Sequence, residues 1–256
     1  MDNGFPVTAD RAVFLADAHL CRDDADTRAF VGLAERAAAE GCSLFLLGDI
    51  FDLWFGSPPL TFRFQEPVIA RLRELRRGGL RIHYVEGNRD FYLKRYHEGT
   101  TFDAVAEGEM RAGVGPFRIL LSHGDTVNRA DLPYRFWKAL SKNRLAYGAL
   151  ALCPPSLALP LTERTERTLR RSNLRHKRSF PEREAREYAL RRFSEGADFV
   201  VLGHFHDERL VRFAPDRPAP ALAVLPSWRE GRRHFYLTAD GSFGFRPYRE
   251  GEPLVP

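Results

Sequence analysis

Short apolar runs recur along the chain, and each of them ends at a small cluster of polar residues. Apolar runs of this length are typical of strands that are buried on both faces, as in the sheets of α/β proteins. We therefore predict five buried strands, at residues 12–16, 44–47, 82–85, 119–121 and 199–202.

Between the first three runs, apolar residues recur with the spacing of a helix. One such pattern covers residues 27–40 and stops at Gly41, and another covers residues 64–77 and is followed by Gly78 and Gly79. Glycine directly after the last apolar residue is a common end of a helix. Strands that alternate with helices in this way indicate a mostly parallel sheet of the α/β class.

The last part of the chain has a different pattern. Three apolar segments, at 222–224, 235–238 and 243–245, are separated by turn signals such as Asp240-Gly241. Short strands joined by turns of this kind are typical of antiparallel pairing. We predict that these segments are antiparallel strands that close a second sheet.

Residues 132–194 also break the alternation, because aromatic and leucine-rich sequence is followed there by arginine-rich helical sequence. The charge is unusual too: residues 129–192 hold 16 Lys and Arg but 6 Asp and Glu, in a chain whose net charge is +5. A segment this basic is expected to bind anions, such as phosphate groups, nucleic acid or an acidic membrane surface. We predict that 132–194 is a helical insertion, or lid, over the sheet of a single domain that covers residues 1–256.

The composition is that of a soluble globular protein. Of the 256 residues, 44% are hydrophobic, which is enough for a large core. The three Cys have no paired spacing, which excludes a disulfide scaffold and fits a reducing compartment. No secretory signal is visible, and the nearly apolar stretch 146–161 is too short to span a bilayer and is interrupted by Pro154 and Pro155. We expect a cytoplasmic protein that is at most peripheral to a membrane.

The polar clusters after the five predicted strands are rich in metal-binding side chains. The carboxyl ends of strands in an open α/β sheet form the edge where ligands bind. One such cluster alone is more often a capped turn, but five in order favour a metal site. Two carboxylates, one amide and four imidazoles suit two ions such as Mn²⁺, Fe²⁺ or Zn²⁺, and a shared Asp49 is able to bridge ions about 3.5–4 Å apart. The seven candidate ligands are Asp17, His19, Asp49, Asn88, His123, His204 and His206.

Five short motifs contain these ligands. They are Asp17-Ala18-His19, Gly48-Asp49, Gly87-Asn88-Arg89-Asp90, His123-Gly124-Asp125 and Gly203-His204-Phe205-His206. As a set, spread over about residues 10–210, they resemble the motifs of the calcineurin-like metallophosphoesterases. The resemblance implies a four-layer α/β/β/α sandwich with a two-metal site. It assigns one ion to Asp17, His19, Asp49 and His206, and the other to Asp49, Asn88, His123 and His204.

One motif departs from the commonest pattern of that family, because many members have His where this chain has Arg89. With that arginine, residues 48–54, 87–91 and 123–126 resemble the UDP-2,3-diacylglucosamine pyrophosphohydrolases of lipid A synthesis. The resemblance implies that a metal-activated water hydrolyses the pyrophosphate of UDP-2,3-diacylglucosamine to UMP and 2,3-diacylglucosamine 1-phosphate. We expect Mn²⁺ as the metal, because imidazole ligands together with oxygen ligands admit it, and a place on the inner face of the inner membrane.

The phosphate-binding residues that follow from this resemblance are Asn88, Arg89 and His204, which would also act in catalysis. A guanidinium keeps its charge at any working pH and is able to bind a phosphate through two hydrogen bonds. It therefore stabilises charge on the phosphoryl group, although it cannot act as an acid as His does. The alternative role for Arg89 is a structural salt bridge to Asp90.

The predicted lid supplies the remaining substrate-binding candidates. Asp131 and Tyr134 fall where the resembled enzymes contact the sugar, and Ser172, Arg175 and Lys177 are the nearest counterparts of later residues that contact glucosamine and phosphate. Apolar side chains such as Trp137, flanked by basic ones, suit an interfacial surface that shelters two acyl chains and meets an anionic membrane. The alternative is an ordinary small core beneath the insertion.

Two other functions compete with this hydrolysis. One is a two-metal phosphodiesterase of the same fold that acts on a different nucleotide or lipid head group. The other is a basic module that binds a membrane or nucleic acid and keeps a vestigial metal site. All seven ligand positions hold competent side chains, which favours an enzyme. We expect no nucleic-acid partner and no obligate protein partner.

Overall fold

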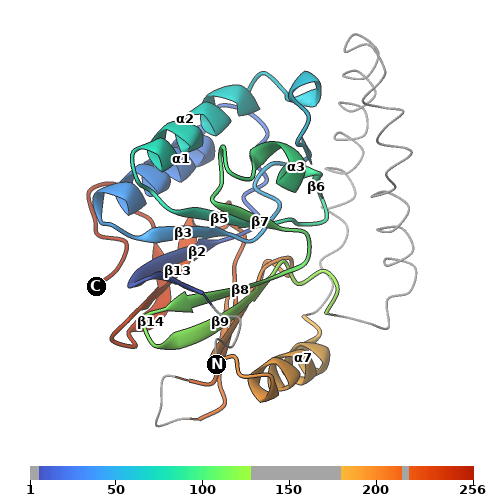
Figure 1. The fold of residues 1–256 in the computed structure, drawn as a ribbon, viewed down its shortest axis with the longest axis vertical. Helices are drawn as coiled ribbons and strands as arrows, with labels where there is room; N and C mark the ends of the chain where they lie inside the picture. Colours follow the sequence, from blue (N-terminus) through green and yellow to red (C-terminus); the bar gives the residue numbers. More distant parts are fainter. Residues whose placement is uncertain (1–5, 128–179, 215–218) are drawn as a thin grey trace.

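Two sheets packed face to face form the centre of the computed structural model, and helices cover both outer faces (Figure 1). The structure describes residues 6–127, 180–214 and 219–256. Helices α1 (Ala25–Ala39) and α2 (Gln65–Arg77) cover one sheet, and α7 (Glu182–Ser194) covers the other. The predicted four-layer α/β/β/α sandwich is therefore confirmed.

The first sheet, here called the β2 sheet, contains most of the N-terminal strands. Its members are β2 (Arg11–Leu15), β3 (Ser43–Leu46), β5 (Ile82–Val85), β7 (Ala104–Ala106), β13 (Arg233–Thr238) and β14 (Phe243–Pro247). Their order is β14-β13-β2-β3-β5-β7. Neighbours from β2 to β7 are parallel, whereas β13 pairs antiparallel with both β2 and β14.

The second sheet, here called the β9 sheet, is mixed. Its members are β1 (Val7–Ala9), β8 (Glu109–Val114), β9 (Phe117–Ser122), β10 (Phe199–Leu202), β11 (Arg209–Arg212) and β12 (Ala221–Val224). Their order is β1-β8-β9-β10-β12-β11. Strands β9, β10 and β12 are parallel, and β8 and β11 pair antiparallel with β9 and β12.

The prediction that the tail strands close one second sheet is wrong. Strand β12 lies in the β9 sheet, parallel to β10, while β13 and β14 extend the β2 sheet. The five ligand-bearing strands are likewise divided, with β2, β3 and β5 in one sheet and β9 and β10 in the other. An apolar run that is buried on both faces does not indicate which sheet it joins. The sequence pattern therefore could not predict how the strands are divided between the two sheets.

Strand β2 shows how alternate side chains build two cores. Phe14 points towards the β9 sheet and stacks on Phe45 of β3, with ring centroids 5.0 Å apart. Val13 and Leu15 point the other way and pack against the apolar faces of α1 and α2. All four side chains are buried, and each contributes about 1.5–3 kcal/mol of hydrophobic free energy.

A small layer follows directly after two of the candidate ligands. Strand β4 (Trp54–Phe55) comes five residues after Asp49 and pairs in parallel with β6 (Asp90–Phe91), which comes two residues after Asn88. The one-turn helix η1 (Pro58–Leu60) and the short helix α3 (Leu93–His97) lie beside this pair. The layer holds the two ligand-bearing loops next to each other.

Helix α7 belongs to the sandwich. Its residues Ala185, Tyr188 and Ala189 are buried against β9, β10 and β12. This helix forms the end of the range that the sequence predicts as an insertion. The rest of that range, up to residue 179, lies outside the described residues, so the lid stays a prediction.

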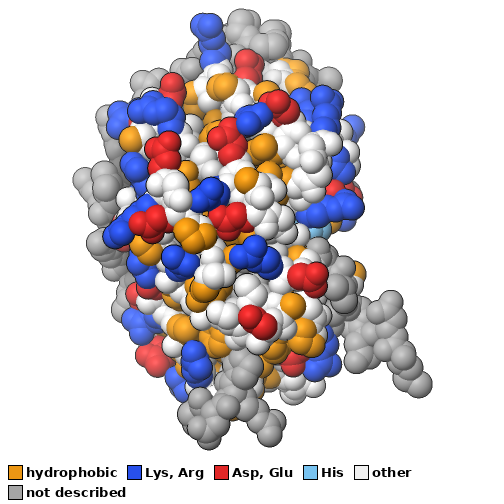
Figure 2. All heavy atoms as spheres, turned by 90° about the vertical axis from the view of Figure 1, so that its left-hand side faces the viewer, with side chains coloured by type: hydrophobic (Ala, Val, Ile, Leu, Met, Phe, Trp, Pro, Cys, Tyr) orange, Lys and Arg blue, Asp and Glu red, His pale blue; other side chains and the backbone are white. Residues whose placement is uncertain are grey.

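Charged side chains of both signs are interspersed on the face that Figure 2 shows. Ion pairs join some surface elements, such as α2 to α1 through Arg71 and Glu35, whose Nε and Oε1 atoms are 2.8 Å apart. Exposed pairs of this kind contribute little to stability. Within the described part of the chain, no helix has the length and apolar character needed to cross a membrane.

Candidate metal centre

The candidate ligands lie just beyond the carboxyl ends of β2, β3, β5, β9 and β10, where the two sheets meet. Two overlapping groups of side chains bring their donor atoms within 4.8 Å of one another. The first group is Asp17, His19 and His206, and the second is Asp17, Asp49 and His123. Parallel strands from both sheets therefore contribute to one cluster.

The first group has the spacing of ligands around one ion. The Nε2 atoms of His19 and His206 are 3.2 Å apart. Asp17 Oδ1 lies 3.3 Å from His206 Nε2 and 3.8 Å from His19 Nε2. Ligand atoms that lie about 2.1 Å from an ion, at right angles to each other, are about 3 Å apart. The three side chains therefore fit a divalent cation with little movement.

Asp17 supplies a direct observation that favours a cation. Its side chain is fully buried, and no hydrogen bond reaches Oδ1, whereas Oδ2 accepts one from the backbone N–H of His204 at 2.7 Å. Burial alone would raise the pKa of Asp17, but the neighbouring His206, His123 and His19 hold this pKa well below its usual range. A buried, ionised carboxylate is costly unless positive charge faces it, and here that charge comes from the histidines or from a bound cation.

The second candidate ion would lie near Asn88. Asn88 Oδ1 is 3.0 Å from His123 Nε2 and 3.2 Å from His204 Nδ1. His123 Nδ1 lies 2.8 Å from the carbonyl oxygen of Leu47, so this nitrogen carries the proton and donates it. A metal-bound His123 would therefore offer the lone pair of Nε2, which faces the cluster, an arrangement common among metal-binding histidines.

Asp49 belongs to the second group, and Asp17 is the residue that the two groups share. Its Oδ1 accepts a hydrogen bond from the backbone N–H of Arg89 at 2.9 Å, and its Oδ2 lies 3.8 Å from His123 Nε2. Gly87 is required next to it, since a Cβ atom at residue 87 would lie 2.2 Å from Asp49 Oδ1. Its neighbours thus hold the Asp49 carboxylate in place, and its bridging role stays a prediction.

Asp90 orders these loops, a role that the sequence motif alone did not reveal. Its Oδ2 accepts hydrogen bonds from the backbone N–H groups of Asp49 and Gly87 and from the hydroxyl of Tyr84, at 2.8–2.9 Å. Burial, with the nearby charge of Asp49, raises the pKa of Asp90 to about 7. Only the proximity of β5 to both loops reveals the contribution of Tyr84, because no spacing in the sequence signals it.

Five of the seven candidate ligands have a left-handed backbone. Their φ angles lie between 45° and 72°, a region that residues other than glycine rarely adopt and that costs about 1 kcal/mol or more for each. Such strain persists only where the surrounding structure holds it, and it is concentrated at functional sites. The five are Asp17, His19, Asp49, His204 and His206.

Arg89 is buried beside Asp49. Its Nη1 donates to the backbone carbonyl of Asp52 at 3.1 Å and lies 3.5 Å from the Asp52 carboxylate, while its Nε lies 3.8 Å from Asp49 Oδ2. The ion pairs of Arg89 thus join it to Asp49 and Asp52, and not to Asp90, the partner considered from the sequence. Its guanidinium lies beside the candidate ligand Asp49, and its phosphate-binding role stays a prediction.

The predicted lid residues cannot be placed against this cluster. Asp131, Tyr134, Ser172, Arg175 and Lys177 lie outside the described residues, as does Trp137. Their roles stay predictions from the sequence.

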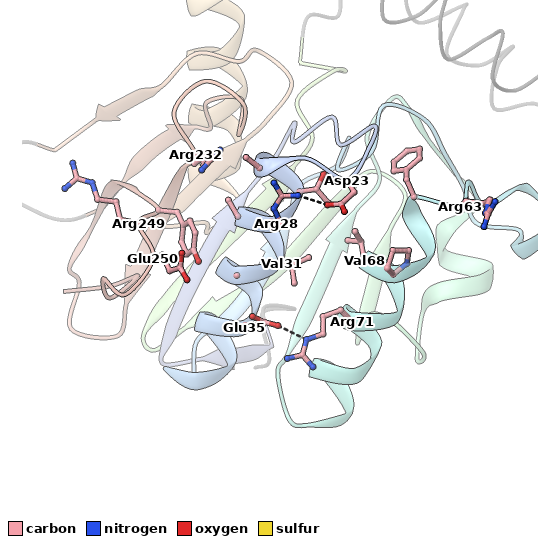
Figure 3. A pocket seen from close by; sticks show the side chains of 17 residues that line it. Asp23, Arg28, Val31, Glu35, Arg63, Val68, Arg71, Arg232, Arg249 and Glu250 are labelled. Carbon is pink, nitrogen blue, oxygen red and sulfur yellow. Dashed lines mark hydrogen bonds and ion pairs between the residues drawn. The ribbon is translucent and has the colours of Figure 1, made fainter.

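A groove of about 1150 Å³ lies between α1, α2 and the segment after β14 (Figure 3). Val31 and Val68 line it, and the ion pair of Arg71 with Glu35 crosses it. None of the seven candidate ligands lines this groove. The metal centre and the groove are therefore separate features.

Comparison with known proteins gives relatives along almost the whole chain. A protein of Chromohalobacter salexigens named UDP-2,3-diacylglucosamine hydrolase is 28% identical over 227 residues, which are 86% of this chain and 89% of that protein. Proteins of the same name from Pseudomonas putida and Azotobacter vinelandii are each 28% identical, over 89% and 90% of this chain and 94% and 95% of theirs. The family model of the calcineurin-like phosphoesterases matches residues 11–208, a range that includes all seven candidate ligands. The chain therefore belongs to the calcineurin-like phosphoesterase family.

Proposed function

We propose that this chain hydrolyses the pyrophosphate bond of UDP-2,3-diacylglucosamine and releases UMP and 2,3-diacylglucosamine 1-phosphate. The observation that carries the chemistry is the convergence of buried carboxylate, amide and imidazole groups around the buried Asp17. The substrate follows from the names of the relatives, which match this chain over most of its length. Arg89 supports the same substrate, because it is the residue by which the sequence resembles those enzymes.

The proposed centre holds two divalent cations. Asp17, His19 and His206 would bind one, Asn88, His123 and His204 the other, and Asp49 both. Mixed oxygen and imidazole donors suit Mn²⁺, which we propose as the metal. When bound, such ions lower the pKa of water and neutralise charge on phosphate oxygens.

Side chains around the phosphate would bind it and stabilise its charge. Burial and the nearby His123 lower the pKa of His204 to about 4, so this imidazole is neutral near pH 7 and is able to donate a hydrogen bond without adding charge. Arg89 adds a permanent positive charge beside Asp49. Together with the amide of Asn88, these groups would hold the pyrophosphate and stabilise the charge that grows on it.

We assign the lipid part of the substrate to the predicted lid, in the part of residues 132–194 that precedes α7. Asp131 and Tyr134 would contact the sugar, and Ser172, Arg175 and Lys177 the glucosamine and its phosphate. The basic excess in this range would also bring the chain to an anionic membrane surface, on the cytoplasmic side of the inner membrane.

The test is a mass-spectrometric assay with UDP-2,3-diacylglucosamine and Mn²⁺. We expect UMP and the diacylated sugar phosphate as products, loss of turnover on chelation and its return with Mn²⁺. Asp49→Ala should abolish turnover and lower the content of both ions. A chain that cleaves a cyclic nucleotide or a nucleotide sugar faster than the lipid substrate would overturn the proposed substrate and keep the reaction class.

A further inference from the structure

The segment that follows β12 crosses the turn that carries Asp17 and His19. Ser227 Oγ donates a hydrogen bond to the backbone carbonyl of Asp17 at 3.0 Å. Arg229 Nε donates to the backbone carbonyl of His19 at 3.1 Å. More than 200 positions separate these partners in the sequence, so only the fold brings them together.

Arg229 also ties this turn to the start of α1. Its Nη2 lies 3.1 Å from Asp24 Oδ2 and 3.4 Å from Cys21 Sγ. Asp24 is the N-cap of α1, because its Oδ1 accepts hydrogen bonds from the first backbone N–H groups of the helix. One guanidinium therefore fixes the ligand turn relative to a rigid helix.

The Asp17–His19 turn needs such support because both of its ligands are strained. Their φ angles are 52° and 45°. The backbone N–H groups of Asp17 and His19 donate to the carbonyls of Gly48 and Asp49, at 3.1 and 3.0 Å. Those bonds hold the amide side of the turn, and Ser227 and Arg229 hold the carbonyl side.

We propose that Ser227 and Arg229 are positioning residues that set the geometry of the ion bound by Asp17, His19 and His206. The inference rests on the proposed metal centre, and it goes further by assigning two residues to one of the two ions. Their hydrogen bonds to the ligand loops end on the Asp17–His19 turn, and the loop of Asn88 receives none of them. Removal of either side chain should therefore lower the affinity for that ion and leave the affinity for the other ion unchanged.

The experiment is a titration of the full chain with Mn²⁺, followed by calorimetry and by electron paramagnetic resonance, which distinguishes an isolated ion from a coupled pair. Wild type should bind two ions and give the coupled signal. In Arg229→Gln, the affinity for one ion should fall about 10–100-fold, as is typical when a residue that orients a metal ligand is lost. The affinity for the other ion should stay within about twofold, and at one equivalent the spectrum should be that of an isolated ion.

Arg232→Gln is a matched control. Arg232 lies on the same segment, at one end of the groove in Figure 3, and its Nε donates to Asp26 Oδ1 in the first turn of α1 at 2.9 Å. Its side chain is 38% exposed, compared with 29% for Arg229. The two substitutions thus remove similar ion pairs with α1, but Arg229 alone of the two contacts the ligand turn. Arg232→Gln should lose comparable thermal stability and keep both ions.

Two further variants separate positioning from folding. Ser227→Ala should lower the affinity for the same ion as Arg229→Gln does, because it removes the hydrogen bond to the Asp17 carbonyl. Arg229→Lys keeps a charge beside Asp24 and should restore the melting temperature, but one ammonium cannot also hold the His19 carbonyl, so the affinity should remain low.

Three outcomes of these measurements would overturn the positioning role of Ser227 and Arg229. Two ions with wild-type affinity in Arg229→Gln and Ser227→Ala, or equal weakening of both ions, would overturn the positioning role and leave the proposed function intact. The positioning role would also be overturned if Arg232→Gln weakened Mn²⁺ binding as much as Arg229→Gln does. A wild-type chain that binds no Mn²⁺ would overturn the proposed metal centre and this inference together.

Discussion

Replacement of Gly87 by alanine probes the candidate metal centre at its tightest contact. A Cβ atom at this position would lie 2.2 Å from Asp49 Oδ1, 2.8 Å from Asp49 N and 2.9 Å from Asp49 Cγ. Favourable contacts between non-bonded atoms are at about 3.5 Å, so the Asp49 carboxylate or the loop must move by about 1 Å. A displacement of 1 Å in a catalytic constellation costs about 10²-fold in rate, and overpacking costs about 1–3 kcal/mol of stability.

We therefore expect Gly87→Ala to lower kcat/KM about 10²-fold and the free energy of unfolding by about 1–3 kcal/mol. The assay is Mn²⁺-dependent hydrolysis of a small chromogenic phosphodiester, which needs no contact with acyl-binding residues, together with urea unfolding. Metal content, measured on the same samples, should fall as well, because Asp49 is the residue shared by both proposed ions.

Gly108→Ala is the control for this experiment. A Cβ at residue 108 meets no atom within 4 Å, and the backbone there is not left-handed. This variant should keep kcat/KM within about twofold of wild type. If Gly87→Ala matched it in rate and metal content, the position of the Asp49 carboxylate would not matter for turnover, and the assignment of Asp49 as the bridging ligand would be refuted.

Three other outcomes are expected. Arg89→Gln should lower kcat/KM about 10²-fold with metal content retained, because it removes a charged donor near the phosphate and no proposed ligand; loss of the metal instead would make Arg89 structural. Trp137→Ala should lower kcat/KM for the diacylated substrate far more than for the small phosphodiester, and an equal loss on both would contradict the acyl-binding lid. Burial lowers the pKa values of His97 and His234 to about 4, so the unfolded chain takes up their protons first and stability should fall as pH drops from about 6.5 towards 4. Urea unfolding at pH 7.5 and 5 checks this, with a loss of about 2 kcal/mol per histidine that His97→Leu should reduce.

The elements with the clearest pattern were predicted closely. The strands expected at 82–85 and 199–202 have those bounds in the structure. The first helix starts two residues earlier than expected, at Ala25, because Asp24 caps it with a side-chain oxygen. That cap depends on a β-region backbone at Asp24, which apolar spacing does not reveal.

The candidate ligands were identifiable from the sequence because each follows a strand directly. The residues that hold them were not, since their partners come from distant segments. Tyr84 and Asp90 meet through β5 and the Gly87 loop, and Ser227 and Arg229 reach the first ligand turn from beyond β12. Spacing along a chain records what is local, whereas these contacts arise only when the sheets are assembled.

The division of the ligands between two sheets has a consequence for folding. Asp17, Asp49 and Asn88 follow strands of the β2 sheet, while His123 and His204 follow strands of the β9 sheet. Only the assembled sandwich offers both sets at once, so a bound cation would act as a cross-link between the layers and favour the native state by mass action. At a free concentration 100 times the dissociation constant, the gain is about 2.7 kcal/mol for one ion. The supply of metal in the cell would then affect how long the chain survives proteolysis, as well as how fast it catalyses its reaction.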